Sequence, residues 1–201
     1  MKQQHNNLRI HLLLILLLVS FNASALDVIN IEGKAANQAL SELEDTLKNE
    51  PNNIFALKNA GILLHQMSRK TPDEDAVKKS ESYLKKVISS QPKDYEAQAW
   101  LGSVITMKAL FEKDPGKQTF FVKLGTRKMD KAVKKTPNNL IVRLIRANNS
   151  MELPPFLKRT RFAVTDFEYY LEACKTENCS DSALQHARLS LAEAKKIVME
   201  N

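Results

Sequence analysis

Histidines and paired carboxylates, which carry much of enzymatic acid–base and metal chemistry, are few and scattered in this chain. After residue 25 the histidines are His65 and His186, and neither belongs to a His-Glu-x-x-His frame. No serine lies in a Gly-x-Ser-x-Gly turn, and 5 glycines in 201 residues leave little material for phosphate-binding loops. Acidic pairs such as Glu42 and Glu44 have the spacing of solvated helix faces. We therefore expect a non-catalytic protein without metal or cofactor; an enzyme whose carboxylates meet only across a cleft remains the alternative.

One group of basic side chains has a regular spacing. Lys123, Arg127 and Lys131 recur at four-residue steps within an expected helix, residues 118–136, and therefore share one face. Lys134 or Lys135 extends that face. The opposite side is expected to hold mostly apolar residues: Phe120, Phe121, Leu124, Met129, Ala132 and Val133. The basic face predicts either a solvated surface or an electrostatic contact with an acidic protein or anionic head groups.

Arg143 and Arg146 form a second basic feature, one helical turn apart in the otherwise apolar run of residues 140–147. Arginines at such positions need partners because a buried unpaired charge is costly. One interpretation is pairing within the chain, with three candidate acids: Asp166, Glu168 and Asp130. The other is a site that recognises an anion, since guanidinium groups match carboxylates and phosphates.

The first 25 residues have the order of a secretory signal. Residues 1–9 are polar and contain Lys2 and Arg9, residues 10–19 are apolar apart from His11, and small residues precede the end of the segment. We predict cleavage after Ala25 and export across the inner membrane, most simply to the periplasm. The apolar run of roughly ten residues is shorter than the ~20 of a membrane-spanning helix. An uncleaved anchor is the alternative.

The exported part sets the remaining bounds on composition. Removing 25 of 201 residues leaves 176, which suits one domain with its own core. Its 28 basic and 23 acidic side chains give a net charge of +5, which is mildly basic, and export argues against a nucleic-acid partner. Cys174 and Cys179 have four residues between them, which is neither a redox nor a zinc spacing. In an oxidising compartment this pair predicts a short disulfide, with free thiols as the alternative.

A repeated pattern organises the middle of the chain: an amphipathic helix, a proline, a polar pair and another helix. It occurs at Pro51, Pro92 and Pro137. Each proline ends a helix, and the Asn or Asp after it is expected to cap the next one. Gly61 and Gly102 each lie ten residues after a proline. A helical glycine costs roughly 1 kcal/mol relative to alanine, so both predict the close approach of a neighbouring helix.

These positions resemble the tetratricopeptide repeat (TPR) family over roughly residues 35–150. The matching residues are Ala39, Leu43, Pro51, Leu57, Ala60, Gly61, Leu64, Leu84, Val87, Pro92, Leu101, Gly102, Met129, Ala132 and Pro137, with Ala147 in the place of a third glycine. Successive prolines are 41 and 45 residues apart, longer than the family's 34-residue period. The excess is assigned to longer turns at residues 68–75 and 112–116.

The resemblance implies an all-α fold of antiparallel helical hairpins stacked as a short TPR-like solenoid. In this family the first helix of each hairpin lines the concave binding face. By that analogy the candidate peptide contacts are Lys58, Ile62, His65, Ser103 and Thr106. Trp100 lies either at that surface or in the core.

The last 49 residues are expected to form a terminal helical pair. Residues 153–155 break the chain, and one helix is predicted over residues 156–174, with an aromatic-rich side of Phe156, Phe162, Phe167, Tyr169 and Tyr170. Residues 180–199 show helical spacing of apolar residues and form the second helix. This pair suits a cap with a polar outer face. The expected organisation is a signal peptide (1–25), a short lead (26–34), degenerate repeats (35–152) and the cap (153–201).

These observations predict an exported, TPR-like protein-interaction module, a scaffold, assembly factor or adaptor whose partner is a protein or peptide. The alternative function is an envelope-associated binder of anionic lipid or of another acidic ligand, which would use the basic helix face. The sequence leaves the identity of the partner and the oligomeric state open.

Overall fold

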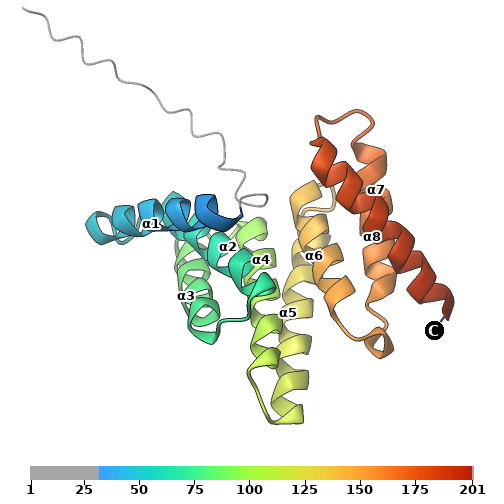
Figure 1. The fold of residues 1–201 in the computed structure, drawn as a ribbon, viewed down its shortest axis with the longest axis horizontal. Helices are drawn as coiled ribbons and strands as arrows, with labels where there is room; N and C mark the ends of the chain where they lie inside the picture. Colours follow the sequence, from blue (N-terminus) through green and yellow to red (C-terminus); the bar gives the residue numbers. More distant parts are fainter. Residues whose placement is uncertain (1–31, 201) are drawn as a thin grey trace, which may run out of the picture.

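The computed structural model describes residues 32–200, so the predicted signal peptide and residues 26–31 of the lead lie outside the described residues. The described chain is all-helical and contains no strand. Its elements are α1 (Gly33–Asn49), α2 (Ile54–Lys70), α3 (Glu74–Ser90), α4 (Tyr95–Met107), the 3-10 turn η1 (Lys108–Leu110), α5 (Pro115–Lys135), α6 (Leu140–Glu152), the 3-10 turn η2 (Pro155–Leu157), α7 (Thr160–Ala173) and α8 (Asp181–Glu200) (Figure 1). None of these helices combines the length and the apolar character needed to cross a bilayer.

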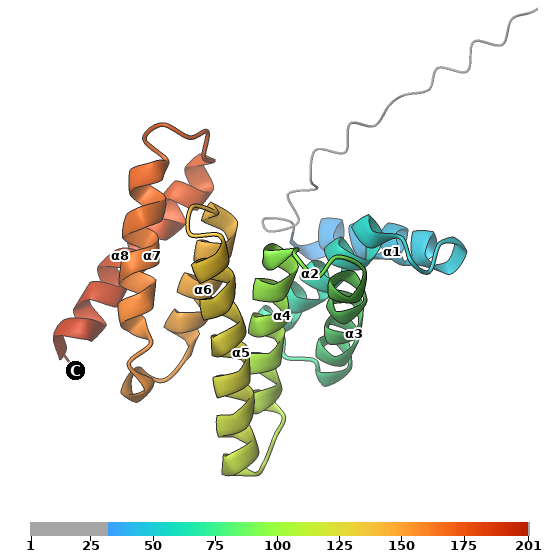
Figure 2. The ribbon, with the colours of Figure 1, turned by 180° about the vertical axis from the view of Figure 1, so that it is seen from behind.

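Each helix packs mainly against its neighbours in the sequence. The most extensive contacts join α2 to α3, α4 to α5 and α6 to α7, and α8 packs against α7. The helices of a pair lie side by side and run in opposite directions (Figures 1 and 2). Between pairs, α4 also contacts α6. The predicted all-α architecture of antiparallel hairpins is therefore observed in the described part of the chain.

The helix ends follow the proline–polar pattern. The three repeated prolines lie just beyond the ends of α1, α3 and α5. The side chains of Asn53, Asp94 and Asn139 then accept a hydrogen bond from the third backbone N–H of α2, α4 and α6. This is N-capping, which satisfies a backbone donor that the helix itself leaves unpaired. The capping prediction is confirmed at all three positions.

The helical glycines lie where two helices approach closely. A Cβ on Gly61 would lie 2.9 Å from the Cγ atom of Leu84 in α3. Gly102 in α4 faces Gly125 in α5, where added Cβ atoms would lie 2.7 and 2.3 Å from the opposing backbone oxygens. The prediction of close approach at Gly61 and Gly102 is confirmed. Gly125, which the repeat pattern did not single out, completes the α4–α5 contact.

The apolar core consists of two clusters that meet at α6. The larger one gathers buried side chains from α1 to α6, including Leu57, Trp100 and Met129. The smaller one joins α6 to α7 and α8 around Phe167 and Tyr170. A chain of polar side chains lies between α5, α6 and α7, where the two clusters adjoin. The core therefore depends on an ionic junction as well as on apolar packing.

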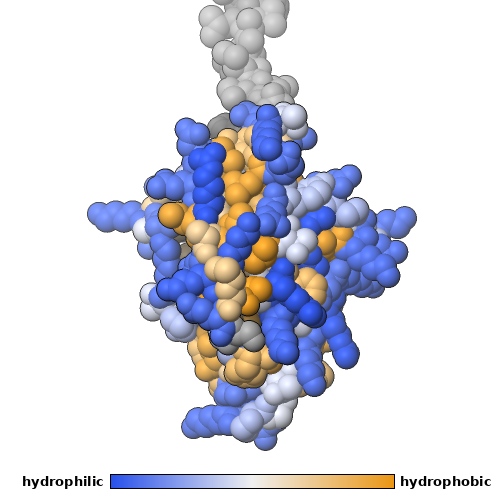
Figure 3. Space-filling model, turned by 90° about the vertical axis from the view of Figure 1, so that its right-hand side faces the viewer, coloured by the Kyte–Doolittle hydropathy of each residue, from blue (hydrophilic) through white to orange (hydrophobic). Residues whose placement is uncertain are grey.

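The C-terminal pair differs from the prediction in two respects. The helix predicted from residue 156 begins at Thr160 instead, because Lys158 adopts a left-handed conformation (φ 55°) that ends the η2 turn. Phe156 is therefore outside α7 and is exposed, so the predicted aromatic side is not continuous. The outer face is also not uniformly polar. Exposed apolar residues on α8 include Leu189 and Met199, and an apolar band crosses the side where α7 and α8 lie (Figure 3).

The predicted disulfide is present. Cys174, at the end of α7, is bonded to Cys179, just before α8, with their Cα atoms 5.6 Å apart. Both cysteines also pack against the smaller apolar cluster. The bond therefore constrains the turn between the last two helices.

Candidate functional site

A cavity of about 840 Å³ lies on the side of the molecule formed by α2, α4 and α6. The C-terminal half of α2, the middle of α4 and most of α6 supply its floor, and α1 and α8 contribute its two sides. Its lining contains apolar residues such as Leu40, Leu144 and Ile145 together with polar ones such as His65 and Asn149. Mostly apolar walls with a few convergent polar groups are typical of ligand sites. We call this cavity the groove.

The floor of the groove holds a polar network that connects three helices. His65 Nε2 from α2 lies 2.8 Å from Ser103 Oγ in α4. Asn149 from α6 donates through Nδ2 to Thr106 Oγ1 at 2.6 Å and to Ser103 Oγ at 3.3 Å. Thr106 in turn donates to the backbone oxygen of Ser103 at 2.7 Å. These bonds tie α2, α4 and α6 together directly beneath the groove.

Some polar atoms of the floor have no partner in the described part of the chain. Ser103 Oγ accepts from Asn149 and contacts His65 Nε2. The neutral imidazole carries one hydrogen, and its tautomer sets which of His65 and Ser103 donates. Among the described residues, three buried atoms here have no hydrogen-bond partner: His65 Nδ1, Trp100 Nε1 and Asn149 Oδ1. Buried polar groups are normally paired, so these three atoms are exceptions in the packing beneath the groove.

His65 is neutral in the folded protein. Burial lowers the pKa of its imidazole to about 3, and the positive charge of Arg69 acts in the same direction. The pKa of His186, on the α8 side, is also lowered by burial and by Arg69. His65 additionally packs edge-on against the Trp100 ring, with centroids 5.3 Å apart. Its role is therefore hydrogen bonding and packing rather than charge.

Charged side chains at the rim are paired with one another. Arg69 Nε from α2 donates to Glu152 Oε1 of α6 at 2.6 Å, which links these two helices. Lys70 pairs with Glu32, close to the start of α1. His186 of α8 lies 2.8 Å from Asn148 Oδ1 of α6. The rim therefore has polar bridges that link helices from different hairpins.

The five residues predicted to contact a peptide lie in different environments in the structure. His65 and Ser103 line the groove. Thr106 is buried behind Ser103 and supports the network rather than the lining. Lys58 is bound in ion pairs with Asp94 and Glu96, and Ile62 is buried in the larger apolar cluster. The face selected by family analogy therefore overlaps the groove only in part, because the cavity lies against the C-terminal half of α2.

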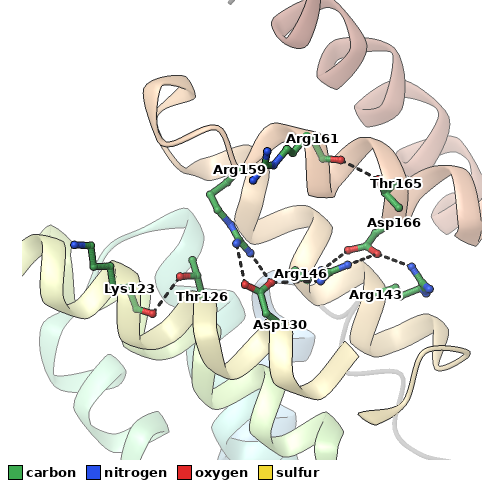
Figure 4. A network of polar contacts seen from close by, with 9 residues as sticks. All are labelled: Lys123, Thr126, Asp130, Arg143, Arg146, Arg159, Arg161, Thr165 and Asp166. Atoms are coloured by element: carbon green, nitrogen blue, oxygen red, sulfur yellow. Dashed lines mark hydrogen bonds and ion pairs between the residues drawn. The ribbon is translucent and has the colours of Figure 1, made fainter. Parts of the chain in front are cut away.

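Arg143 and Arg146 pair within the chain, as the first of their two interpretations predicted (Figure 4). Arg146 forms two hydrogen bonds with the Asp166 carboxylate, at 2.7 and 2.9 Å. Arg143 contacts the same carboxylate at 2.7 Å. Arg146 also reaches Asp130 at 3.3 Å, and Arg159 binds Asp130 through two nitrogens. The ion pairs of both arginines thus link α5, α6 and α7.

The third candidate acid has a different partner. Glu168 lies on the exposed side of α7 and pairs with Lys195 of α8 at 2.8 Å. Aromatic rings complete the ionic junction, with the Arg143 guanidinium 3.8 Å from the Tyr169 ring centroid and that of Arg159 4.0 Å from Phe162. The junction contains three arginines and two aspartates that pair with one another, so these side chains hold helices together.

Several groove residues carried no signal in the sequence. Nothing in the local sequence distinguishes Asn149, Glu152 and Arg69 from other polar helix residues, and they line the groove only because the fold brings α2 and α6 together. Trp100 satisfies both of its interpretations, because it is 4% exposed and belongs to the core yet also lines the groove. Among the described residues, no group of three or more His, Cys, Asp and Glu side chains has an arrangement that could hold a metal ion.

Comparisons of the chain with protein-family models, with curated proteins and with solved structures found no match in any of the three.

Proposed function

We propose that this protein is a non-catalytic binding module of the cell envelope that holds an extended segment of a partner protein in the groove. The observation that carries the proposal is the groove itself, with polar side chains such as His65, Ser103 and Asn149 on its floor and apolar residues in its walls. An extended peptide carries backbone N–H and C=O groups that can pair with polar side chains of the lining. The apolar walls would accept its side chains.

The arrangement of helices supports the same proposal. Consecutive antiparallel pairs, with α4 in contact with both its own partner and α6, are what stacked TPR-like hairpins require. In this interpretation α2, α4 and α6 are the first helices of three hairpins and form the inner face of a short solenoid. The sequence pattern of residues 1–25 supports export, which would bring the groove to partners in the periplasm.

Trp100 provides a direct assay, because it is the single tryptophan of the chain and it lines the groove. The protein starting at residue 26 is titrated with peptides selected from an array of envelope-protein sequences, and Trp100 emission is recorded. We expect saturable changes for bound peptides. Peptides that bind without changing Trp100 emission, or a complete lack of binders, would contradict the proposal.

A matched pair of variants on α8 locates the binding. Ser182 lines the groove, so Ser182→Phe narrows it. Gln185, one turn further along the same helix, is exposed and does not line it, so Gln185→Phe is the control. We expect Ser182→Phe to weaken peptide binding at least tenfold, equivalent to about 1.4 kcal/mol. Equal affinities for the two variants would place the peptide elsewhere.

A further inference from the structure

The net positive charge of the described chain comes from one helix. Residues 32–200 contain 28 basic and 22 acidic side chains, and α5 holds seven of the basic ones and one of the acidic ones. The rest of the described chain is therefore balanced, with 21 of each. The single acid of α5, Asp130, is engaged by Arg146 and Arg159 and does not neutralise the helix surface.

The exposed sector of α5 contains most of these cations and two large apolar side chains. Stepping by three or four residues, one line along the helix contains Lys117, Phe120, Leu124, Arg127 and Lys131. All five are exposed, as are the flanking lysines at positions 123, 134 and 135. We call this the α5 outer face. The sequence-based placement of Phe120 and Leu124 on the side opposite the cations is wrong.

The cations of this face are available for a partner. Lys117 has Glu112 at 3.7 Å, but no carboxylate among the described residues lies within ion-pair distance of the other five: Lys123, Arg127, Lys131, Lys134 and Lys135. Elsewhere the exposed lysines Lys48, Lys78 and Lys175 each have an acid within one turn. Single exposed lysines such as Lys34, Lys86 and Lys93 also lack an acidic partner among the described residues, but the α5 outer face gathers five such cations on one helix.

The apolar residues of the face indicate what kind of anion it contacts. Phe120 is 58% exposed and Leu124 is 36% exposed, and they lie among the cations rather than at the core. Leu110, in the turn that packs against the start of α5, is 66% exposed. An acidic polymer would need only the charges. A surface of anionic head groups over acyl chains accommodates cations and apolar side chains together.

We infer that the α5 outer face is a docking surface for anionic phospholipid membranes. In this arrangement the lysines and Arg127 contact the head groups, while Phe120 and Leu124 enter the boundary with the acyl chains. The α4–α5 connection, which projects at one end of the molecule (Figure 1), would lie nearest the membrane. This surface is separate from the groove, so the inference does not depend on the proposed peptide binding.

Co-sedimentation of the protein from residue 26 onward tests the inference. Vesicles of phosphatidylcholine alone are compared with an equal mixture of phosphatidylcholine and phosphatidylglycerol. We expect binding to the mixture only. We also expect binding to be lost between about 0.01 M and about 1 M salt, as the Debye length falls from about 30 to about 3 Å. Binding that is absent, or that ignores lipid charge and salt, overturns the inference.

Two triple variants separate the face from the net charge. The first is Lys123→Glu, Arg127→Glu and Lys131→Glu. The second reverses three exposed lysines outside α5 by the same total charge: Lys34→Glu, Lys86→Glu and Lys93→Glu. Each basic residue near an anionic surface contributes roughly fivefold to binding, so we expect the first variant to lose more than about 100-fold and the second much less. Equal losses would show that only overall charge matters.

A third variant distinguishes lipid from other anions. Phe120→Ser with Leu124→Ser leaves every charge in place, and both residues are already exposed, so circular dichroism is expected to be unchanged. We expect at least about fivefold weaker vesicle binding but unchanged retention on heparin. A protein that binds heparin or polyglutamate but not the anionic vesicles has an acidic polymer as its partner, which overturns the lipid assignment.

Discussion

Replacing Asp166 with Asn is expected to destabilise the protein more than any change at an exposed charge. The Asp166 side chain has no solvent exposure and receives three hydrogen bonds from two arginines, at 2.7, 2.7 and 2.9 Å. Asparagine keeps the shape but removes the negative charge. Arg143 and Arg146, which are 12% and 9% exposed, then remain buried with too few acids.

The size of this effect follows from the burial. Removing one partner of a buried ion pair costs about 3–5 kcal/mol, because the remaining charge keeps its desolvation penalty and loses its compensation. A domain of this size is stable by roughly 5–15 kcal/mol in total. Asp166→Asn should therefore move the urea midpoint substantially while leaving a folded protein in buffer. The loss should appear as cooperative unfolding, since Asp166 joins α7 to α6.

Urea unfolding followed by circular dichroism measures the change, and Glu168→Gln is the matched control. Glu168 lies two residues away on the same helix, but its ion pair with Lys195 is about half exposed on both sides. Exposed pairs contribute about 0–1 kcal/mol, so the control should resemble the original protein. A difference of less than about 1 kcal/mol between the two variants would refute the structural role assigned to the ionic junction.

Three further measurements test the fold and the groove. The pKa of His65 is about 3 in the folded protein, against 6.5 for an unperturbed histidine, so between these pH values the unfolded chain binds a proton that the folded chain does not. The free energy of unfolding should therefore fall by up to about 1.4 kcal/mol per pH unit as the pH drops below ~6.5. His65→Gln should remove this part of the pH dependence in urea titrations at pH 5 and 7. Gly125→Ala places a Cβ 2.3 Å from the Gly102 oxygen and should lower the free energy of unfolding by at least about 2 kcal/mol. In the control Gly116→Ala, the Cβ meets a side-chain oxygen of Asp114 at 3.0 Å, and thermal stability should change little. Equal effects of the two variants would contradict the close α4–α5 packing. Changing Cys174 and Cys179 to serine should lower the free energy of unfolding, measured by calorimetry, by at most about 2 kcal/mol, because the disulfide closes a very short loop. A variant that is unfolded in buffer would show that the bond does more than constrain one turn.

Local patterns were sufficient for most of the helical architecture. The prolines at 51, 92 and 137 and the capping residues after them depend on backbone chemistry within a few positions, so the sequence predicts them directly. The same reasoning failed at Lys158, because a positive φ in a non-glycine residue has no local sequence signal. It also misplaced Phe120 and Leu124, because they were grouped with the other apolar residues of the helix although the helical period puts both among the cations.

The groove could be predicted only in part. The resemblance to a repeat family directed attention to α2 and α4, and His65 and Ser103 do line the cavity. Asn149 could not be found in this way, because its importance comes from reaching Ser103 and Thr106 across more than 40 residues of sequence. The same holds for the Arg69–Glu152 bridge, whose residues are 83 positions apart.

The sequence alone therefore determined that the described chain is helical, where most of its helices begin and end, and that Gly61 and Gly102 mark close contacts, because these depend on short-range backbone and packing rules. The tertiary structure decided which polar groups meet. It assigned Arg143 and Arg146 to Asp166 and Asp130, gathered three unpartnered atoms beneath one groove, and left five cations of α5 on the surface without an acidic partner in the described chain. Those outcomes depend on distances between helices, which no local pattern encodes.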